Sequence, residues 1–79
     1  MRVEVKLPQW GMGMSEGVIL GWRKSVGDTV QEGEPLCEVE AAKVTEELEA
    51  PVSGTLVEVL VEADTEVEVY TVLAVIETA

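Results

Sequence analysis

Residues 39–48 read Val-Glu-Ala-Ala-Lys-Val-Thr-Glu-Glu-Leu. Two strand-like arms flank a short centre, and the segment from Ala41 to Val44 has the length of a four-residue turn. No Asn-Gly or Asp-Gly pair is present, so we expect a type I turn, which accepts ordinary residues. In this register Ala42 and Lys43 occupy the apex of a β-hairpin, and the Lys43 side chain projects into solvent.

Strand signals continue on both sides of this hairpin. The chain contains fifteen valines and no phenylalanine, and apolar residues alternate with acidic ones in residues 57–59 and 66–69. Such alternation, with many β-branched residues, is typical of half-buried strands. Turn residues recur at short intervals along the chain. Several short strands at that spacing predict a small all-β barrel or sandwich.

An ungapped offset of 37 residues aligns the chain with itself. It pairs Gly17 with Gly54, Ile19 with Leu56, Leu20 with Val57, Val30 with Val67, Leu36 with Leu73, Val39 with Ile76 and Glu40 with Glu77. Two similar β units predict two sheets related by an approximate twofold axis, each covering the apolar face of the other. The residues expected in the core are then Trp22, Val39, Val57, Val59 and Ile76.

Length and composition narrow the class of protein. The 79 residues allow one small domain, which we expect to span residues 1–79. One cysteine and no histidine exclude an internal disulfide and a Cys/His zinc site. The longest uncharged run, residues 7–15, is too short to span a bilayer, and no signal-peptide core follows Met1. We expect a reduced, cytoplasmic protein that does not enter a membrane.

The charge is distributed unevenly. The formal net charge is −11; residues 1–24 carry four basic and two acidic side chains, whereas residues 25–79 carry one basic and fourteen acidic ones. This field repels nucleic acid and anionic lipid and favours a basic protein partner. Lys43 is the one basic side chain in the long acidic part.

Catalytic chemistry by the chain itself is not indicated. Without histidine, neither a Ser/His nor a Cys/His pair can form. The carboxylates near Lys43 in the sequence favour its protonated, unreactive amine, so Lys43 suits a residue that another enzyme modifies better than a nucleophile. We expect Cys37 to be a buried, inert thiol. Gly11, Gly13 and Gly17 lack the following helix that a phosphate-binding loop requires.

Several short motifs have a joint order and spacing that cover essentially the whole chain. They are residues 7–17 (Leu-Pro-Gln-Trp-Gly-Met-Gly-Met-Ser-Glu-Gly), Trp22, Val26-Gly27-Asp28, Gly33, Leu36, Glu38-Val39-Glu40, Lys43-Val44, Ala50-Pro51, Gly54 and residues 72–76. Gly33 and Gly54 stand ten residues before and eleven after Lys43. This arrangement resembles the lipoyl domains of the biotin/lipoyl attachment family.

The resemblance implies a fold and a prosthetic group. The fold is a flattened barrel or sandwich of two four-stranded antiparallel sheets with quasi-twofold symmetry, with Lys43 at one end and both termini at the other. The prosthetic group is lipoic acid, joined as an amide to Lys43. The chain would then be a non-catalytic swinging-arm carrier, either free-standing or part of a dihydrolipoamide acyltransferase.

The resemblance also implies a set of partners. A lipoyl ligase or lipoyl transferase would load the domain. The arm would then carry acyl groups and reducing equivalents between a 2-oxo acid decarboxylase, an acyltransferase catalytic domain and dihydrolipoamide dehydrogenase, in a 2-oxo acid or acetoin dehydrogenase complex. The loop at residues 11–17 would lie near the lysine and help partners to recognise the domain.

The sequence departs from the lipoyl pattern at several positions. Ala41 and Ala42 replace the usual Thr and Asp before the lysine, Glu46 stands where an apolar residue is more usual, and Ala63 and Tyr70 stand at turn positions often filled by glycine. Two alternatives therefore stay open. One is a biotin carboxyl carrier with biotin on Lys43, and the other is an unmodified β module used for protein contact.

Overall fold

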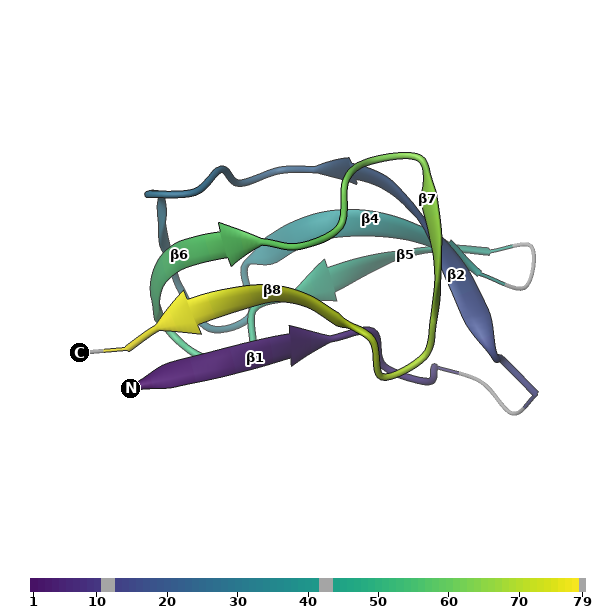
Figure 1. Ribbon diagram of the computed structural model, residues 1–79, viewed down its shortest axis with the longest axis horizontal. Coiled ribbons are helices and arrows are strands. Elements are labelled where there is room, and N and C mark those ends of the chain that lie inside the picture. The colour runs from purple at the N-terminus through teal and green to yellow at the C-terminus, as the bar shows by residue number, and fades with distance from the viewer. Residues whose placement is uncertain (11–12, 42–43, 79) are drawn as a thin grey trace.

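The computed structural model describes residues 1–10, 13–41 and 44–78, which form eight strands (Figure 1). Their bounds are β1 Arg2–Lys6, β2 Glu16–Trp22, β3 Thr29–Val30, β4 Pro35–Ala41, β5 Val44–Glu49, β6 Gly54–Val59, β7 Thr65–Glu68 and β8 Val72–Glu77. No helix in these ranges is both long and apolar enough to cross a membrane.

The strands form two four-stranded sheets, ordered β1-β8-β6-β3 and β5-β4-β2-β7, in which every neighbouring pair is antiparallel. Exchanging β1 with β5, β8 with β4, β6 with β2 and β3 with β7 converts one order into the other. The two sheets pack face to face, so each covers the apolar side of the other (Figure 1). The predicted all-β fold of two related four-stranded sheets is confirmed.

The two halves also match in their turns. The Gly27 amide donates to the Leu56 carbonyl at 2.7 Å, and 37 residues later the Asp64 amide donates to the Ile19 carbonyl at 2.5 Å. Gly27 and Asp64 both have positive φ angles, of 98° and 64°. The residue of the second half that takes the glycine conformation is therefore Asp64, and not its neighbour Ala63. Asp is one of the residue types that tolerate this region.

A β-bulge occurs at the same place in each half. The register of β2 against β4 shifts between Ile19 and Gly21, and the register of β6 against β8 shifts 37 residues further on. Leu20 and Val57 are the extra residues, and a bulge turns such a residue out of the regular alternation. Val57 is consequently half-buried outside the core, so its predicted core position is wrong, and Leu56 is buried there instead.

The core lies between the sheets. Val39 and Ile76 are fully buried as predicted, whereas Trp22 and Val59 are partly buried against the core. The Trp22 Nε1 atom donates to the Val61 carbonyl at 2.8 Å, which satisfies its polar edge. The core consists of Val5, Leu7, Met14, Ile19, Val30, Leu36, Cys37, Val39, Ala41, Leu48, Ala50, Leu56, Leu73, Ala74 and Ile76.

Cys37 is a free thiol at the centre of this core, as predicted, and burial raises its pKa to about 12. Because the folded state favours the neutral thiol, the free energy of unfolding keeps its full value below the ordinary pKa of 9.0 and declines as the pH rises from 9 towards 12.

A thiol reagent at pH 8 should therefore label Cys37 roughly 10³-fold more slowly in the folded protein than in urea. Labelling at equal rates would contradict this burial.

The two chain ends lie side by side at one end of the molecule (Figure 1). The Thr78 amide donates to the Met1 carbonyl at 2.8 Å, and the Met1 ammonium group donates to the Thr78 carbonyl at 3.3 Å. These bonds extend the β1–β8 pairing. Because β8 corresponds to β4 and β1 to β5 in the other sheet, the contact between Met1 and Thr78 corresponds to the β4–β5 junction.

Candidate attachment site at the β4–β5 junction

Strands β4 and β5 form the predicted hairpin. Ala41 pairs with Val44, and Glu40 pairs with Thr45. Ala42 and Lys43 stand between Ala41 and Val44 in the sequence and lie outside the described residues, as does the turn geometry predicted for them. The strand pairing around Lys43 is thus confirmed, and the position of its side chain stays a prediction.

The hairpin lies at the end of the molecule opposite the termini (Figure 1). On one side it is supported by β2, because Val18 pairs with Glu40 and Ile19 with Val39. On the other side β5 is an edge strand, and its Val44 is 53% exposed. Ala41, the last residue of β4, is buried. The described part of the hairpin is therefore anchored in the core through β4 and open to solvent through β5.

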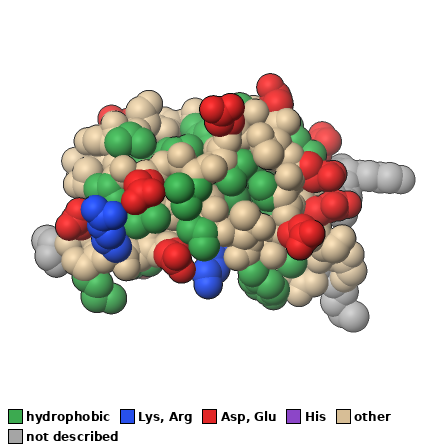
Figure 2. Space-filling model, in the orientation of Figure 1, with side chains coloured by type: hydrophobic (Ala, Val, Ile, Leu, Met, Phe, Trp, Pro, Cys, Tyr) green, Lys and Arg blue, Asp and Glu red, His purple; other side chains and the backbone are tan. Residues whose placement is uncertain are grey.

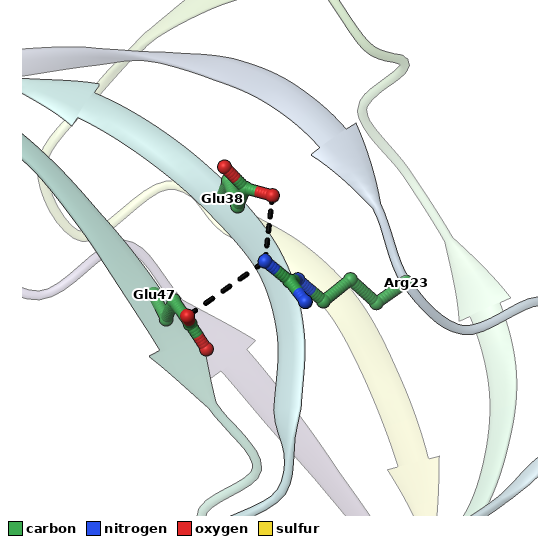
Figure 3. Close-up of polar contacts among 3 residues, drawn as sticks. All are labelled: Arg23, Glu38 and Glu47. Carbon is green, nitrogen blue, oxygen red and sulfur yellow. Dashed lines mark hydrogen bonds and ion pairs between the residues drawn. The ribbon is translucent and has the colours of Figure 1, made fainter.

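On the face shown in Figure 2, several acidic side chains lie close together at this end of the molecule. In the hairpin Glu38 and Glu47 are direct cross-strand neighbours, an arrangement in which like charges repel. The Arg23 guanidinium lies between them, with its Nη2 atom 2.7 Å from Glu38 Oε1 and 3.7 Å from Glu47 Oε1 (Figure 3). The Arg23 amide also donates to the Leu36 carbonyl at 2.7 Å. Arg23 therefore joins β4 and β5 at the base of the hairpin.

Replacing Arg23 should loosen this base only slightly. All three side chains are about half exposed, so solvent screens the ion pairs. We expect Arg23→Gln to lower the free energy of unfolding by less than about 1 kcal/mol at low salt, and by less still at high salt. Urea denaturation of Arg23→Gln, Glu47→Gln and the double variant measures the coupling. A coupling that does not weaken with added salt would contradict an electrostatic role.

The segment that leads from β1 into β2 is fastened to the turn between β7 and β8. The Tyr70 amide donates to the Leu7 carbonyl at 2.7 Å, and the Leu7 amide donates to the Thr71 carbonyl at 3.0 Å. The Val69 amide donates to the Ser15 carbonyl at 3.0 Å. Both ends of the segment are thus held at the hairpin end of the molecule (Figure 1).

The described residues of the uncharged segment 7–15 contribute both to the core and to the surface. Met14 is buried and fills the core, whereas Trp10 is 38% exposed. The Gln9 side-chain amide donates to the Met14 carbonyl at 3.0 Å. Gly11 and Met12, which belong to the predicted recognition loop, lie outside the described residues.

Two features of this site were not predicted from the sequence. The contact of Arg23 with Glu38 and Glu47 depends on a cross-strand register that the residue pattern alone does not give. Tyr70 stood at an expected glycine position, and it does adopt a positive φ, of 68°. The hydrogen bond from the Tyr70 amide to the Leu7 carbonyl, which helps to hold the segment between β1 and β2, is not predicted by the residue pattern.

Comparison with known proteins gives the family. The family model described as biotin-requiring enzyme, the biotin/lipoyl model, matches residues 3–76. The chain is 46% identical over 71 residues, 90% of its length, to the dihydrolipoyllysine-residue acetyltransferase component of the pyruvate dehydrogenase complex of Corynebacterium glutamicum. It is 40% identical over 67 residues, 85% of its length, to the corresponding component of the acetoin cleaving system of Bacillus subtilis.

The chain spans 10% and 17% of the lengths of these two relatives. Among solved structures, it resembles the lipoyl domain of the 2-oxoglutarate dehydrogenase complex from Azotobacter vinelandii, with a TM-score of 0.77 and 23% identity. This alignment covers 98% of the chain and 99% of that domain, and it supports the fold. The match of nearly every residue to one family model, together with the twofold pair of sheets, shows that the chain belongs to the biotin/lipoyl attachment family.

Proposed function

We propose that residues 1–79 form one carrier domain, lipoylated on Lys43, that moves acyl groups and reducing equivalents between the enzymes of a 2-oxo acid or acetoin dehydrogenase complex. The domain itself catalyses no step. The observation that carries the proposal is the β4–β5 hairpin, whose strands pair up to Ala41 and Val44, on either side of the one lysine in the acidic part of the chain.

The residues around Lys43 fit an attached arm. β4 is fixed by its pairing with β2 and by buried Ala41, whereas β5 is an edge strand with Val44 largely in solvent. A side chain carried between these strands has a rigid base on one side and access for a ligase on the other. Amide formation also removes the positive charge of Lys43, which makes the loaded domain more acidic than its formal net charge of −11.

Lipoic acid would supply a dithiolane that can be opened, acylated and closed again. The protein supplies a fixed body that keeps the arm at the partner's active site. Tethering raises the effective concentration of the arm there without any new contact. The acidic end of the domain favours partners whose entrances are basic.

The resemblance to lipoyl domains implies the partners in this proposal. A ligase or transferase would attach the arm, a 2-oxo acid decarboxylase would acylate it, an acyltransferase domain would pass the acyl group to coenzyme A, and dihydrolipoamide dehydrogenase would reoxidise the dithiol. We place this work in the cytoplasm, because the free thiol of Cys37 suits a reducing compartment.

Biotin on Lys43 is the second candidate. The matching family model carries the description biotin-requiring enzyme, and Ala42 precedes the lysine where lipoyl domains usually have Asp. The resulting biotin carboxyl carrier would use the same hairpin to carry a carboxylate.

Intact-mass measurement tests the proposal. The chain is produced once with a lipoate ligase and lipoate, and once with a biotin ligase and biotin. We expect one lipoyl increment in the first sample, located on the peptide that contains Lys43, and little or no increment in the second. A biotin increment with no lipoyl increment would favour the second candidate. No increment in either sample would favour an unmodified β module.

A further inference from the structure

Strand β5 is the longest edge strand in the described part of the chain. Its six residues compare with five, two and four in the other edge strands, β1, β3 and β7. On the side away from β4, its sheet contains no further strand among the described residues. The backbone N–H and C=O groups of such an edge can pair with a strand of another molecule, and proteins usually carry a feature that prevents this.

Glu46 lies on the core-facing side of β5. Its direct cross-strand neighbour is Val39, which is fully buried, and direct neighbours in a sheet point to the same face. Val44 and Leu48, two residues away in each direction, share this face because side chains alternate along a strand. The inward row of β5 therefore consists of an exposed glutamate between two apolar residues.

The matching position in the other sheet is apolar. Ile76 matches Val39 in the repeat, and its neighbour on the edge strand β1 is Val3, which is half-buried. An apolar side chain therefore fits this place in the sandwich, and the fold does not require the carboxylate of Glu46. β1 has a different protection, since it ends in Lys6, and lysine on an edge strand discourages pairing.

One antiparallel register aligns the apolar residues of β5 with those of a second copy of β5. A twofold axis perpendicular to the sheet at Glu46 keeps inward side chains inward and places Val44 opposite Leu48 of the second copy. On the outward face Glu47 then meets Thr45, so no like charges are opposed there. On the inward face, however, the two Glu46 side chains stand directly opposite each other. Like charges in this arrangement oppose pairing, the more so where pairing buries them.

We propose that β5 is a strand edge complementary to a second copy of itself, and that the charge of Glu46 keeps this edge unpaired. Without that charge, the inward row would be apolar across both copies, and the two domains would share one continuous sheet. A paired β5 would cover the side of the hairpin that is open to solvent, next to Lys43. The value of preventing this rests on the proposed function, whereas the pairing itself does not.

Sedimentation equilibrium of the unmodified chain tests the proposal. We expect the wild type to be a monomer and Glu46→Val to form a reversible dimer of about twice that mass, with a dissociation constant at least ~10-fold lower. The thermal midpoint of Glu46→Val, measured at a concentration where it is monomeric, should equal or exceed that of the wild type. Glu46→Thr, which removes the charge but adds less apolar surface, should associate more weakly than Glu46→Val and more strongly than the wild type.

Three further variants separate the position of the charge from its mere removal. Glu47→Val makes the same change on the outward face and should stay monomeric, because the two Glu46 side chains remain opposed. Glu46→Lys should also stay monomeric, since two like charges still meet. Adding Val44→Lys to Glu46→Val should restore the monomer, because Val44 provides the contact with Leu48 of the second copy.

Amide hydrogen exchange locates the interface in the dimer. The amides of β5 should exchange more slowly in Glu46→Val at high than at low concentration, whereas those of β1 should be unchanged. With lipoate ligase, the rate of loading per molecule should fall as the concentration of Glu46→Val rises, and that of the wild type should not.

The outcomes distinguish this proposal from the proposed function. A wild-type dimer, a monomeric Glu46→Val and Glu46→Thr, an equal dimer of Glu47→Val, or protection confined to other strands would each overturn the role of Glu46. A lower midpoint for monomeric Glu46→Val would also contradict it, because the carboxylate would then serve the fold. The mass of the group on Lys43 reports on the proposed function alone, since sedimentation and hydrogen exchange need no lipoyl group.

Discussion

Lys43→Arg should remove the whole lipoyl mass increment from the chain. The ligase forms an amide with a primary amine, and a guanidinium group keeps the charge without accepting the acyl group. The free energy of unfolding should stay within about 0.5 kcal/mol of the wild-type value, as is usual for a charge-conserving change at a surface position, which is where the sequence predicts Lys43. Intact mass after production with ligase and lipoate, together with urea denaturation, provides both values.

Lys24→Arg and Lys6→Arg are the matched controls. Lys24 forms an ion pair with Glu34 at 3.2 Å, and Lys6 is exposed at the end of β1. Both variants should keep the full increment. If the increment persists in Lys43→Arg and disappears in either control, Lys43 is not the attachment residue. If Lys43→Arg unfolds the domain, Lys43 has a structural role that the hairpin does not explain.

Gly54→Ala should lower the free energy of unfolding by about 3 kcal/mol, a large part of the stability of a small domain. A Cβ atom at Gly54 would clash with the carbonyl oxygen of Glu77 and would lie 2.9 Å from Ile76 Cγ2. The backbone of β8 cannot move away without breaking its pairing with β6. Urea denaturation measures the loss, with an unchanged slope expected because the folded state remains compact.

Two other glycines provide a graded comparison. A Cβ atom at Gly17, the matching residue of the first half, would lie 2.9 Å from Val39 Cγ1, which belongs to a side chain and not to the backbone of a paired strand, so Gly17→Ala should cost less, about 1 kcal/mol. A Cβ atom at Gly21 would meet nothing within 4 Å, and Gly21→Ala should have little effect or stabilise slightly. Equal losses at all three positions would mean that the close approach of β6 and β8 does not determine the result.

The repeat in the sequence predicted much of the fold because it arises from geometry that both halves must satisfy. Gly17 and Gly54 match because each lies against the opposite strand, and Ile19 and Leu56 match because each is buried. The same offset relates β2, β3 and β4 to β6, β7 and β8, which are three of the four strand pairs that exchange between the sheets. A periodic signal of this kind therefore predicts topology as well as strand content.

The errors have equally specific causes. Val57 was assigned to the core by strict alternation, but a β-bulge inserts one residue and reverses the faces on either side of it. The alternating pattern contains no sign of the bulge. Ala63 was assigned a glycine-like turn position that Asp64 occupies, since an alignment of short motifs does not fix a turn to a single residue.

At the candidate site the sequence was informative about residue types and less so about contacts. The hairpin strands around Lys43 followed from Val39 to Leu48. Two features depend on which residues face each other across strands and turns. They are the ion pairs of Arg23 with two carboxylates and the hydrogen bonds of the exposed turn at Tyr70. Those relationships are long-range, and a single sequence does not specify them.

The hydrogen bonds between Met1 and Thr78 have a practical consequence for protein engineering. Because the two ends already lie as neighbours, a short peptide link would join them into a closed ring without bending either strand. Such a ring would have fewer conformations available when unfolded, and so would gain stability by entropy. It could then be opened at another exposed turn, giving a permuted carrier whose attachment points to a larger assembly are chosen freely.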